Sequence, residues 1–411
     1  MNLIKKNITK VKQSATLVIN EKSKQLIAEG KTVYSFGFGQ SPFPVPETIV
    51  SVLKDNAHKK EYLPMQGLEE LREAVSKYLL IQTGVNFSKD NILITPGSKE
   101  AMLLMHVAFN GDILLPTSSW VSYEPQANIA KNKTHWIKTK RENNWFPTAD
   151  EFEKKIKTIK KNKNIIFILN SPNNPSGCVC NNLKQLAKIA KKYKVLVLSD
   201  EIYTDLTFNG NYESISKFYP EGTLISGGLS KWCGAGGWRL GFIAVPDNLK
   251  KFLKSLKTLA SESYSTVNTP LQHAAVEAYS GDYEDYKNKT RRILESVGNY
   301  AYNNLKSNKV LLTPPAGAFY LMPEFVGTKF KNSSQLCGKI LEDTGVALLP
   351  GSDFGFEPKK MIARLSYTDF DGKKFLNSID ATNVLTDGMV EKFAPNVVEG
   401  IKKLSNWAKK I

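Results

Sequence analysis

Short apolar runs alternate with helical segments through much of this chain, and this pattern constrains the fold more than any other feature. The runs occupy residues 92–94, 113–115, 165–169, 195–198, 224–225 and 242–245. Continuous apolar strands separated by helices are typical of a largely parallel sheet that is covered on both faces. The sequence therefore predicts an α/β fold, with ligands bound at the carboxyl ends of the strands.

The length allows a second, smaller domain. With 411 residues, the chain can form one large domain and a smaller one. A long helical stretch is expected from about 269 to 305, and the residues after it have the pattern of a smaller α+β unit. We expect a segment at 1–45 that contributes to the small domain, a large domain at 46–290 and a small C-terminal domain at 291–411.

The chain is strongly basic. Its 56 Lys and Arg residues against 39 Asp and Glu residues give a formal charge of +17, which is compatible with nucleic acid as a partner. The lysines, however, are spread through helical stretches such as 153–161 and are not gathered with aromatic residues. This favours a solvated surface. We expect no nucleic-acid partner, although a regulator that binds nucleic acid stays open as a remote alternative.

Cysteine and hydropathy patterns argue against several classes of protein. Cys178 and Cys180 have no second pair at metal-ligand spacing, so no metal site and no disulfide framework are expected. No apolar run approaches the 18 or so residues of a membrane span. The basic residues at the N-terminus are not followed by an apolar segment of signal-peptide length. We expect a cytoplasmic protein that does not enter a membrane.

Lys231 is the first candidate for a catalytic group. It lies between a short apolar strand and a glycine-rich turn, and Arg239 follows eight positions later. A lysine that attacks a carbonyl must lose its proton, and a confined site near other cations lowers a lysine pKa. Because most lysines are solvated surface groups, Lys231 alone would be weak evidence for a catalytic site. Residues at the ends of other strands strengthen this interpretation.

Two of these strand ends carry groups that suit a charged ligand. Asp200 emerges from the strand at 195–198, and a carboxylate there needs a cationic partner such as a protonated pyridine nitrogen. Gly97 and Ser98 form a turn between a strand and a helix, which suits a phosphate. Trp120 also follows a strand, where packing in the core is its commoner role.

Two further positions favour binding of a small acid. Arg364 lies inside a strand-like segment at 361–367, where it is either a solvated edge charge or a fork that grips a carboxylate. Gly39 belongs to a loop rich in Gly and Pro at 34–44, which is either a plain turn or a loop that closes over a substrate.

Taken together and in this order, these residues resemble the class I/II pyridoxal-phosphate-dependent aminotransferases of fold type I, the aspartate aminotransferase superfamily. The resemblance runs from the loop around Gly39 to Arg364. It implies pyridoxal 5′-phosphate as the cofactor. It also implies that Lys231 holds this cofactor as an internal aldimine and shuttles a proton during the reaction, while Asp200 pairs with the pyridinium nitrogen.

The resemblance assigns further roles to residues around the cofactor and the substrate. Tyr203 and Asn174 would hydrogen-bond the phenolic oxygen of the ring, and Trp120 would stack on its face. The positions that match the phosphate site are Gly97, Ser98, Lys99 and Arg239. Arg364 would clamp the α-carboxylate of the substrate, with Gly39 and Asn174 beside it.

The resemblance also implies a homodimer with shared active sites. Tyr62 is similar to a tyrosine that reaches the phosphate of the neighbouring subunit, and Thr266 is a looser match to a second such contact. One position departs from the family pattern, because many members have a phosphate-binding serine where this chain has Gly228. Ser226 or Ser230 could supply the missing hydroxyl.

The predicted reaction is transamination from an L-amino acid to a 2-oxo acid through pyridoxamine phosphate. A lyase that performs β-elimination, or other chemistry at the α-carbon, stays open as an alternative because the same cofactor site serves it. The amino acid is not identified. No second arginine for a dicarboxylate is evident, and the aromatic residues near the loop, Tyr34, Phe36, Phe38 and Phe43, either favour apolar substrates or are packing.

Overall fold

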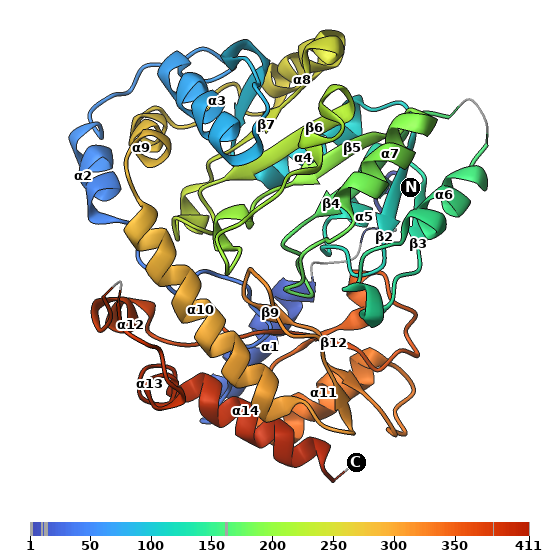
Figure 1. Cartoon of the computed structure of the whole chain (residues 1–411), viewed down its shortest axis with the longest axis vertical. Coiled ribbons are helices and arrows are strands. Elements are labelled where there is room, and N and C mark those ends of the chain that lie inside the picture. Colours follow the sequence, from blue (N-terminus) through green and yellow to red (C-terminus); the bar gives the residue numbers. More distant parts are fainter. Residues whose placement is uncertain (1–2, 10, 12–14, 161–162, 381, 411) are drawn as a thin grey trace.

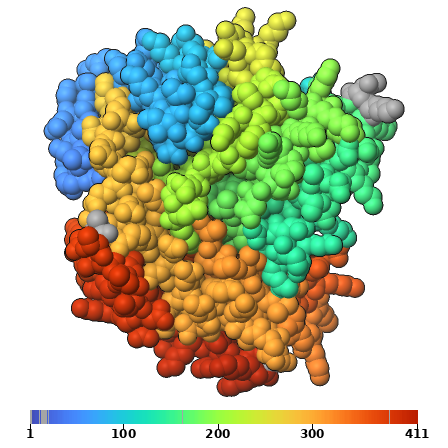
Figure 2. All heavy atoms as spheres, in the orientation of Figure 1, coloured from blue at the N-terminus to red at the C-terminus, as the bar shows by residue number. Residues whose placement is uncertain are grey.

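The computed structural model divides into a large sheet with its helices and a smaller unit beside it (Figure 1). It describes residues 3–9, 11, 15–160, 163–380 and 382–410. In Figure 2 the C-terminal residues, coloured orange to red, fill one end of the molecule, and residues coloured blue, green and yellow fill the other.

The large sheet has seven strands in the order β1-β7-β6-β5-β4-β2-β3. The strands are β1 (Ile92–Thr95), β2 (Asp112–Pro116), β3 (Thr134–Ile137), β4 (Ile165–Asn170), β5 (Leu196–Asp200), β6 (Thr223–Gly228) and β7 (Gly241–Ala244). Neighbours pair in parallel except that β7 runs antiparallel to β1 and β6. This confirms the predicted α/β fold. The edge strand β3 was not predicted because it is only half-buried and lacks an apolar run.

Helices cover both faces of this sheet. On one face, Leu93, Ile113 and Leu198 pack in a single apolar cluster with α4 (Ser98–Ala108), α5 (Tyr123–Ala130) and α8 (Lys250–Ser263). On the other face, Leu114 and Val197 pack with α6 (Ala149–Lys157) and α7 (Leu183–Tyr193). The helices α3 (Glu69–Thr83) and α9 (Thr269–Ser280) cover the rest of that face, and α2 (Glu47–Asp55) packs on α9. Strands buried on both faces explain the continuous apolar runs.

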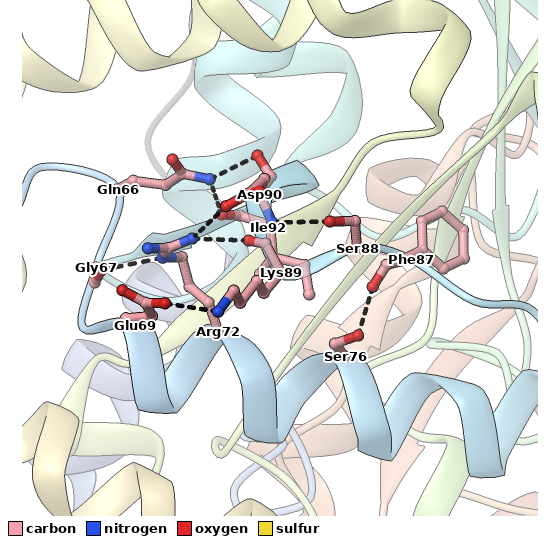
Figure 3. A network of polar contacts seen from close by, with 10 residues as sticks. All are labelled: Gln66, Gly67, Glu69, Arg72, Ser76, Phe87, Ser88, Lys89, Asp90 and Ile92. Atoms are coloured by element: carbon pink, nitrogen blue, oxygen red, sulfur yellow. Dashed lines mark hydrogen bonds and ion pairs between the residues drawn. The ribbon is translucent and has the colours of Figure 1, made fainter.

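A polar network fixes α3 to the beginning of β1 (Figure 3). The buried Arg72 donates hydrogen bonds to the carbonyl oxygens of Gly67 and Lys89, at 3.1 and 3.0 Å, and pairs with Asp90 at 3.4 Å. The amide of Gln66 donates to the Asp90 carbonyl oxygen at 2.8 Å. Because β1 leads directly to the turn at Gly97, this network holds one side of the predicted phosphate site.

The stretch predicted to be helical from about 269 to 305 is helical within these bounds, and it consists of two helices. α9 ends at Ser280 and α10 (Glu284–Leu305) begins four residues later. A Cβ on Gly281 would lie 2.7 Å from the carboxylate of Glu277 and 2.7 Å from the ring of Tyr283. Glycine therefore permits the tight turn that separates the helices.

The smaller unit is built on short strands and on helices from both ends of the chain. A three-stranded sheet has the order β11-β12-β9, and β10 pairs with β8. These strands are β8 (Val310–Leu311), β9 (Tyr320–Leu321), β10 (Glu324–Phe325), β11 (Leu349–Pro350) and β12 (Ala363–Ser366). The helices are α1 (Ala15–Ala28), α11 (Ser333–Thr344), α12 (Gly372–Asn377), α13 (Asp387–Phe393) and α14 (Pro395–Ala408).

Two features of the structure concern the predicted domain boundaries near residues 45 and 290. Tyr34 forms a parallel bridge with Val346, which places the N-terminal segment against the smaller unit. The helix α10 runs through residue 290 without a break. The division at 1–45, 46–290 and 291–411 stays a prediction.

Short 3₁₀ helices connect many of these elements. They are η1 (Lys89–Asn91), η2 (Arg141–Asn143), η3 (Thr204–Leu206), η4 (Ile215–Lys217), η5 (Pro220–Gly222), η6 (Gly236–Trp238), η7 (Asp247–Leu249) and η8 (Gly351–Phe354). Two of them, η3 and η6, follow strands of the large sheet and adjoin the candidate site.

The helices of the described ranges include none that is both long enough and apolar enough to pass through a bilayer. The four cysteines are free and buried. Burial raises the pKa of the Cys178, Cys180 and Cys233 thiols to about 12, so these side chains act as small apolar core groups.

Candidate active site

A cavity of about 480 Å³ opens where strands of the large sheet end and the smaller unit begins. Its volume lies within the range of small-molecule sites. Of the predicted site residues, ten line it, namely Gly39, Ser98, Lys99, Trp120, Asn174, Asp200, Tyr203, Lys231, Arg239 and Arg364. Gly97 lies directly behind Arg239. The structure thus brings together groups that are far apart in the sequence.

Lys231 projects into this cavity from the turn after β6. Its Nζ donates a hydrogen bond to the Gly39 carbonyl oxygen at 2.8 Å. The pKa of Lys231 is lowered to about 8, mainly by burial; the charges of Arg364 and Arg239 contribute to this shift, whereas the charge of Asp200 opposes it. A lysine with such a pKa is partly neutral near pH 7 and can act as a nucleophile or a base.

Asp200 is the last residue of β5 and is buried. Its carboxylate accepts hydrogen bonds from the Tyr123 hydroxyl at 2.6 Å and the Ser226 hydroxyl at 3.3 Å. Burial raises its pKa to about 6, against the effect of these hydrogen bonds. Asp200 is therefore mainly ionised at neutral pH, and a cation in the cavity would stabilise it.

Neither Tyr123 nor the hydrogen bond from Ser226 to Asp200 was predicted from the sequence. Asp200 and Ser226 are direct partners in the parallel register of β5 and β6, so correct strand alignment could have paired them. Tyr123 begins α5, and no local sequence signal indicates its partner across the sheet.

Tyr203 and Asn174 lie together as predicted. The Tyr203 hydroxyl is 2.8 Å from the Tyr320 hydroxyl, and the Asn174 amide donates to the Tyr203 oxygen at 3.4 Å. Tyr320 also lines the cavity and was not predicted, because its partner Tyr203 lies 117 residues away in the sequence. Because one hydroxyl donates to the other, the accepting phenol remains free to donate a hydrogen bond to an oxygen of a ligand.

Arg364 is a buried wall residue and not a solvated edge charge. Its guanidinium donates to the Asn174 side-chain oxygen at 3.1 Å and to the Gly37 carbonyl oxygen at 2.6 Å, and it lies 4.8 Å from the Tyr320 ring centre. Within the described part of the chain its Nε has no hydrogen-bond partner. The fork is thus held in one orientation, as binding of a carboxylate requires.

The opposite end of the cavity suits an anion. Arg239 has a left-handed backbone, with φ of 59°, and donates to the carbonyl oxygens of Gly236 at 2.8 Å and Pro96 at 3.3 Å. A side chain on Gly97, whose φ is 84°, would collide with the Arg239 guanidinium. Ser98 begins α4, so amide groups at a helix N-terminus face this end.

Lys99 and Trp120 complete this end. The Lys99 ammonium lies 5.4 Å from the centre of the Trp120 ring. Burial lowers the pKa of Lys99, and Arg239 adds to the effect. Trp120 lines the cavity and contacts Tyr123 edge to face at 5.4 Å, so it is a wall residue and not a core residue.

The structure explains why glycine occupies position 228. A Cβ there would lie 2.7 Å from the Leu240 carbonyl oxygen and 2.9 Å from the Gly241 Cα, so the approach of β7 leaves no room for a serine. Ser226 is buried and donates to Asp200, whereas Ser230 lines the cavity. Of the two predicted substitutes, Ser230 is the one that can reach a ligand.

Tyr62 and Thr266 lie outside the cavity. Tyr62 is 89% exposed, and Thr266 contacts the backbone carbonyl of Val267 at 3.4 Å. A single chain does not bring either residue to the site, so their predicted contacts across a subunit interface stay predictions.

Comparison with known proteins agrees with this geometry. Residues 31–379 match the family Aminotransferase class I and II. The chain is 32% identical over 378 residues to an aspartate aminotransferase of Geobacillus stearothermophilus, which covers 88% of this chain and 93% of that protein. It is 30% identical over 402 residues to an asparagine–oxo-acid transaminase of Streptococcus mutans, covering 93% and 99%.

Solved structures show the same fold. An aspartate aminotransferase from Thermus thermophilus with maleate superimposes with a TM-score of 0.85 at 24% identity, covering 99% of this chain and 100% of that one. The predicted resemblance and fold type I are thereby confirmed. Since the family match spans most of the sequence and the curated relatives are aminotransferases, this protein belongs to the class I and II aminotransferases and is an aminotransferase.

Proposed function

We propose that the enzyme moves an amino group from an L-amino acid to a 2-oxo acid with pyridoxal 5′-phosphate held in the cavity. The observation that carries this proposal is the meeting of Lys231 and Asp200 in one cavity at the ends of neighbouring strands. The cofactor, when bound, supplies an aldehyde that condenses with amines and a protonated ring that takes up the electron pair left at the α-carbon.

The residues present fit this cofactor. The cavity of about 480 Å³ has an end formed by Lys99, Arg239 and the N-terminus of α4, which suits a phosphate. The buried Asp200 needs a cation, and a protonated ring nitrogen is one. Tyr203 and Asn174 would hold the phenolic oxygen, and Trp120 would lie against the ring face.

Three side chains of the enzyme would carry out the reaction steps. Arg364 binds the α-carboxylate of the amino acid with its fixed fork and so orients the bond from Cα to its hydrogen. The Nζ of Lys231 accepts the proton from Cα and returns it later in the same half-reaction, for which a pKa of about 8 is suitable. Asp200, ionised above about pH 6, keeps a proton on the ring nitrogen.

We propose an amino acid with a polar or acidic side chain, such as aspartate or asparagine, as the donor. Its support is the names of the two relatives. Among the described lining residues the cations are Lys99, Lys231, Arg239 and Arg364, against one acid, Asp200. Since the cofactor and the α-carboxylate of the substrate engage these cations, the choice of side chain rests on the relatives.

Most of the aromatic residues near the loop do not support an apolar substrate. Tyr34, Phe36 and Phe43 are buried in the main apolar cluster, so they pack the core. Phe38 alone of this group lines the cavity.

We further propose that the enzyme is a cytoplasmic homodimer in which Tyr62 contacts the phosphate of the neighbouring site. The exposure of Tyr62 and its resemblance to the family tyrosine support this. Light scattering of the purified protein tests the dimer. A mixed dimer of Tyr62→Phe and Lys231→Ala chains should keep one intact site, and a monomer in solution would contradict the proposal.

The test of the proposed reaction is spectroscopic. The protein with added pyridoxal 5′-phosphate should absorb in the near-ultraviolet or visible range, and a suitable amino acid should bleach this band. A panel of twenty amino acids identifies the donor, with aspartate and asparagine expected first. Release of ammonia or pyruvate without any 2-oxo acid acceptor would instead indicate a lyase.

A further inference from the structure

A buried ion pair lies behind the turn that carries Lys231. The Lys287 ammonium is 3.0 Å from the Asp205 carboxylate, and their side chains are only 10% and 2% exposed. Asp205 belongs to η3, the 3₁₀ helix that begins directly after Tyr203. Lys287 belongs to the first turn of α10. Neither residue lines the cavity, and the proposed reaction assigns a role to neither.

The Lys287 side of this pair contacts the catalytic turn. Its ammonium lies 4.9 Å from the centre of the Trp232 ring, and Trp232 is the buried residue next to Lys231. A cation over an indole ring is an attractive and directional contact. Lys287 therefore holds the backbone on one side of Lys231.

The Asp205 side contacts α3, where the Lys287 ammonium also lies 5.7 Å from the centre of the Tyr78 ring. Its carboxylate accepts a hydrogen bond from the Tyr78 hydroxyl at 2.8 Å and one from the Gln82 amide at 3.4 Å. Both donors lie near the end of α3. Asp205 is thus fixed by α3 and by Lys287, only two residues after Tyr203, whose hydroxyl faces the cavity.

The helix that carries Lys287 also supports the smaller unit. α10 packs on η3 near the pair and on α12, α13 and α14 farther along its length. Figure 1 shows it running from the end of α9 beside the large sheet to α14. The pair therefore joins four segments, namely the Lys231 turn, η3, α3 and α10.

A contribution to stability is a poor explanation of this arrangement. The cost of removing two charges from water offsets their attraction, so a buried pair adds little net stability, whereas its fixed geometry specifies how segments pack. The pair is also not needed to explain the lowered pKa of Lys231, which burial and the charges of Arg364 and Arg239 account for.

We propose that Lys287 and Asp205 are positioning residues that hold the Lys231 turn and the Tyr203 segment at a fixed separation. The inference rests on the proposed role of Lys231. On this inference, Lys287 affects the reaction rate although its side chain does not contact the substrate, the cofactor or the residues that line the cavity.

The test compares Lys287→Met with two other variants in the enzyme loaded with pyridoxal 5′-phosphate. Methionine keeps the length of the side chain and removes its charge and donors. We expect kcat per bound cofactor to fall by about ten- to a hundredfold, as for a displacement of a reacting group by up to about 1 Å. KM should change little. The pH midpoint of the cofactor absorbance should move, because the distances from Lys231 to Asp200, Arg364 and Arg239 change.

Lys287→Arg keeps a cation that can reach Asp205 and Trp232, so it should restore most of the rate. Lys289→Met is the matched control, because Lys289 lies on the same helix and pairs with the exposed Asp285 at 2.8 Å. It should leave both kcat and the absorbance midpoint at the wild-type values.

Methionine at position 287 leaves the buried Asp205 without a cation, which can prevent the Lys287→Met variant from folding. In that case the double variant Lys287→Met/Asp205→Asn, which removes both charges, is measured in its place. Wild-type kcat and an unchanged absorbance midpoint in whichever variant folds would overturn the inference, even with a lower melting temperature. If the wild-type protein does not attach the cofactor to Lys231, the proposed function itself fails, which is a separate result.

Discussion

The two walls of the cavity are built in different ways. One wall, with Asp200 and Lys231, comes from neighbouring strand ends of a single sheet, in which Asp200 pairs in register with Ser226. The other wall, with Arg364, is held by the Gly37 carbonyl oxygen across a separation of 327 residues. The first wall is fixed by backbone pairing and the second by packing of the smaller unit. The groups proposed to react thus lie on the wall fixed by backbone pairing, and the group proposed to bind the substrate lies on the assembled wall.

This contrast predicts that a change in the sheet wall alters the reaction itself. In Asp200→Asn the ring nitrogen loses its anionic partner. We expect kcat to fall by at least about a hundredfold, the usual cost of losing one preorganised group in an active site. Steady-state kinetics on protein with measured cofactor content checks this. A kcat within about tenfold of wild type would remove Asp200 from the mechanism.

A change in the assembled wall should instead weaken substrate binding. Arg364→Lys keeps the charge and loses the planar fork. The charge-assisted hydrogen bonds to a carboxylate are worth about 1.5–3 kcal/mol, so KM for the amino acid should rise by about ten- to a hundredfold. The affinity for the cofactor, measured by absorbance titration, should stay at the wild-type value. A large loss of cofactor binding would show that the two walls are not separate in function.

The charges of the sheet wall predict a pH dependence. The pKa of Lys231 is lowered to about 8. Below that pH, the fraction of Lys231 in the neutral amine form therefore rises about tenfold per pH unit, and above it this fraction levels off. The attachment rate of the cofactor to the apoprotein should therefore rise from pH 6 to about pH 8. Stopped-flow absorbance measures this rate. Attachment that levels off only near pH 10 would mean that Lys231 has the pKa of an ordinary surface lysine.

The smallest effect is expected where the two walls meet. Tyr320→Phe removes the hydroxyl that is 2.8 Å from the Tyr203 hydroxyl. The loss of one hydrogen bond costs about 0.5–1.5 kcal/mol, so kcat/KM should fall by a factor of about two to ten. Tyr203→Phe, which also removes a predicted cofactor contact, serves as the comparison and should lose more. Equal losses would place both tyrosines in the same role.

The sequence predicted the sheet wall far better than the assembled wall. Asp200 and Lys231 follow apolar runs, and the carboxyl ends of strands are where such sheets bind ligands. Arg364 and Gly39 were assigned through the family resemblance, since the strand pattern left both open. Tyr320 and the Gly37 carbonyl oxygen were missed, because their partners are fixed only when distant segments pack.

Steric effects limited the prediction elsewhere. Glycine at position 228 was recognised as a departure from the family, but its cause, the close approach of Leu240 and Gly241, exists only in the folded sheet. The break between α9 and α10 was overlooked although Gly281 signals it. The ion pair of Asp205 and Lys287 joins residues 82 positions apart, and neither has a local motif.

The most direct test of the central claim is to reduce the cofactor-loaded protein with borohydride and to map the modified residue by mass spectrometry. The account predicts one labelled site per chain, at Lys231, and no label in Lys231→Ala. Label spread over several surface lysines, or labelling of Lys231→Ala to the wild-type extent, would contradict it.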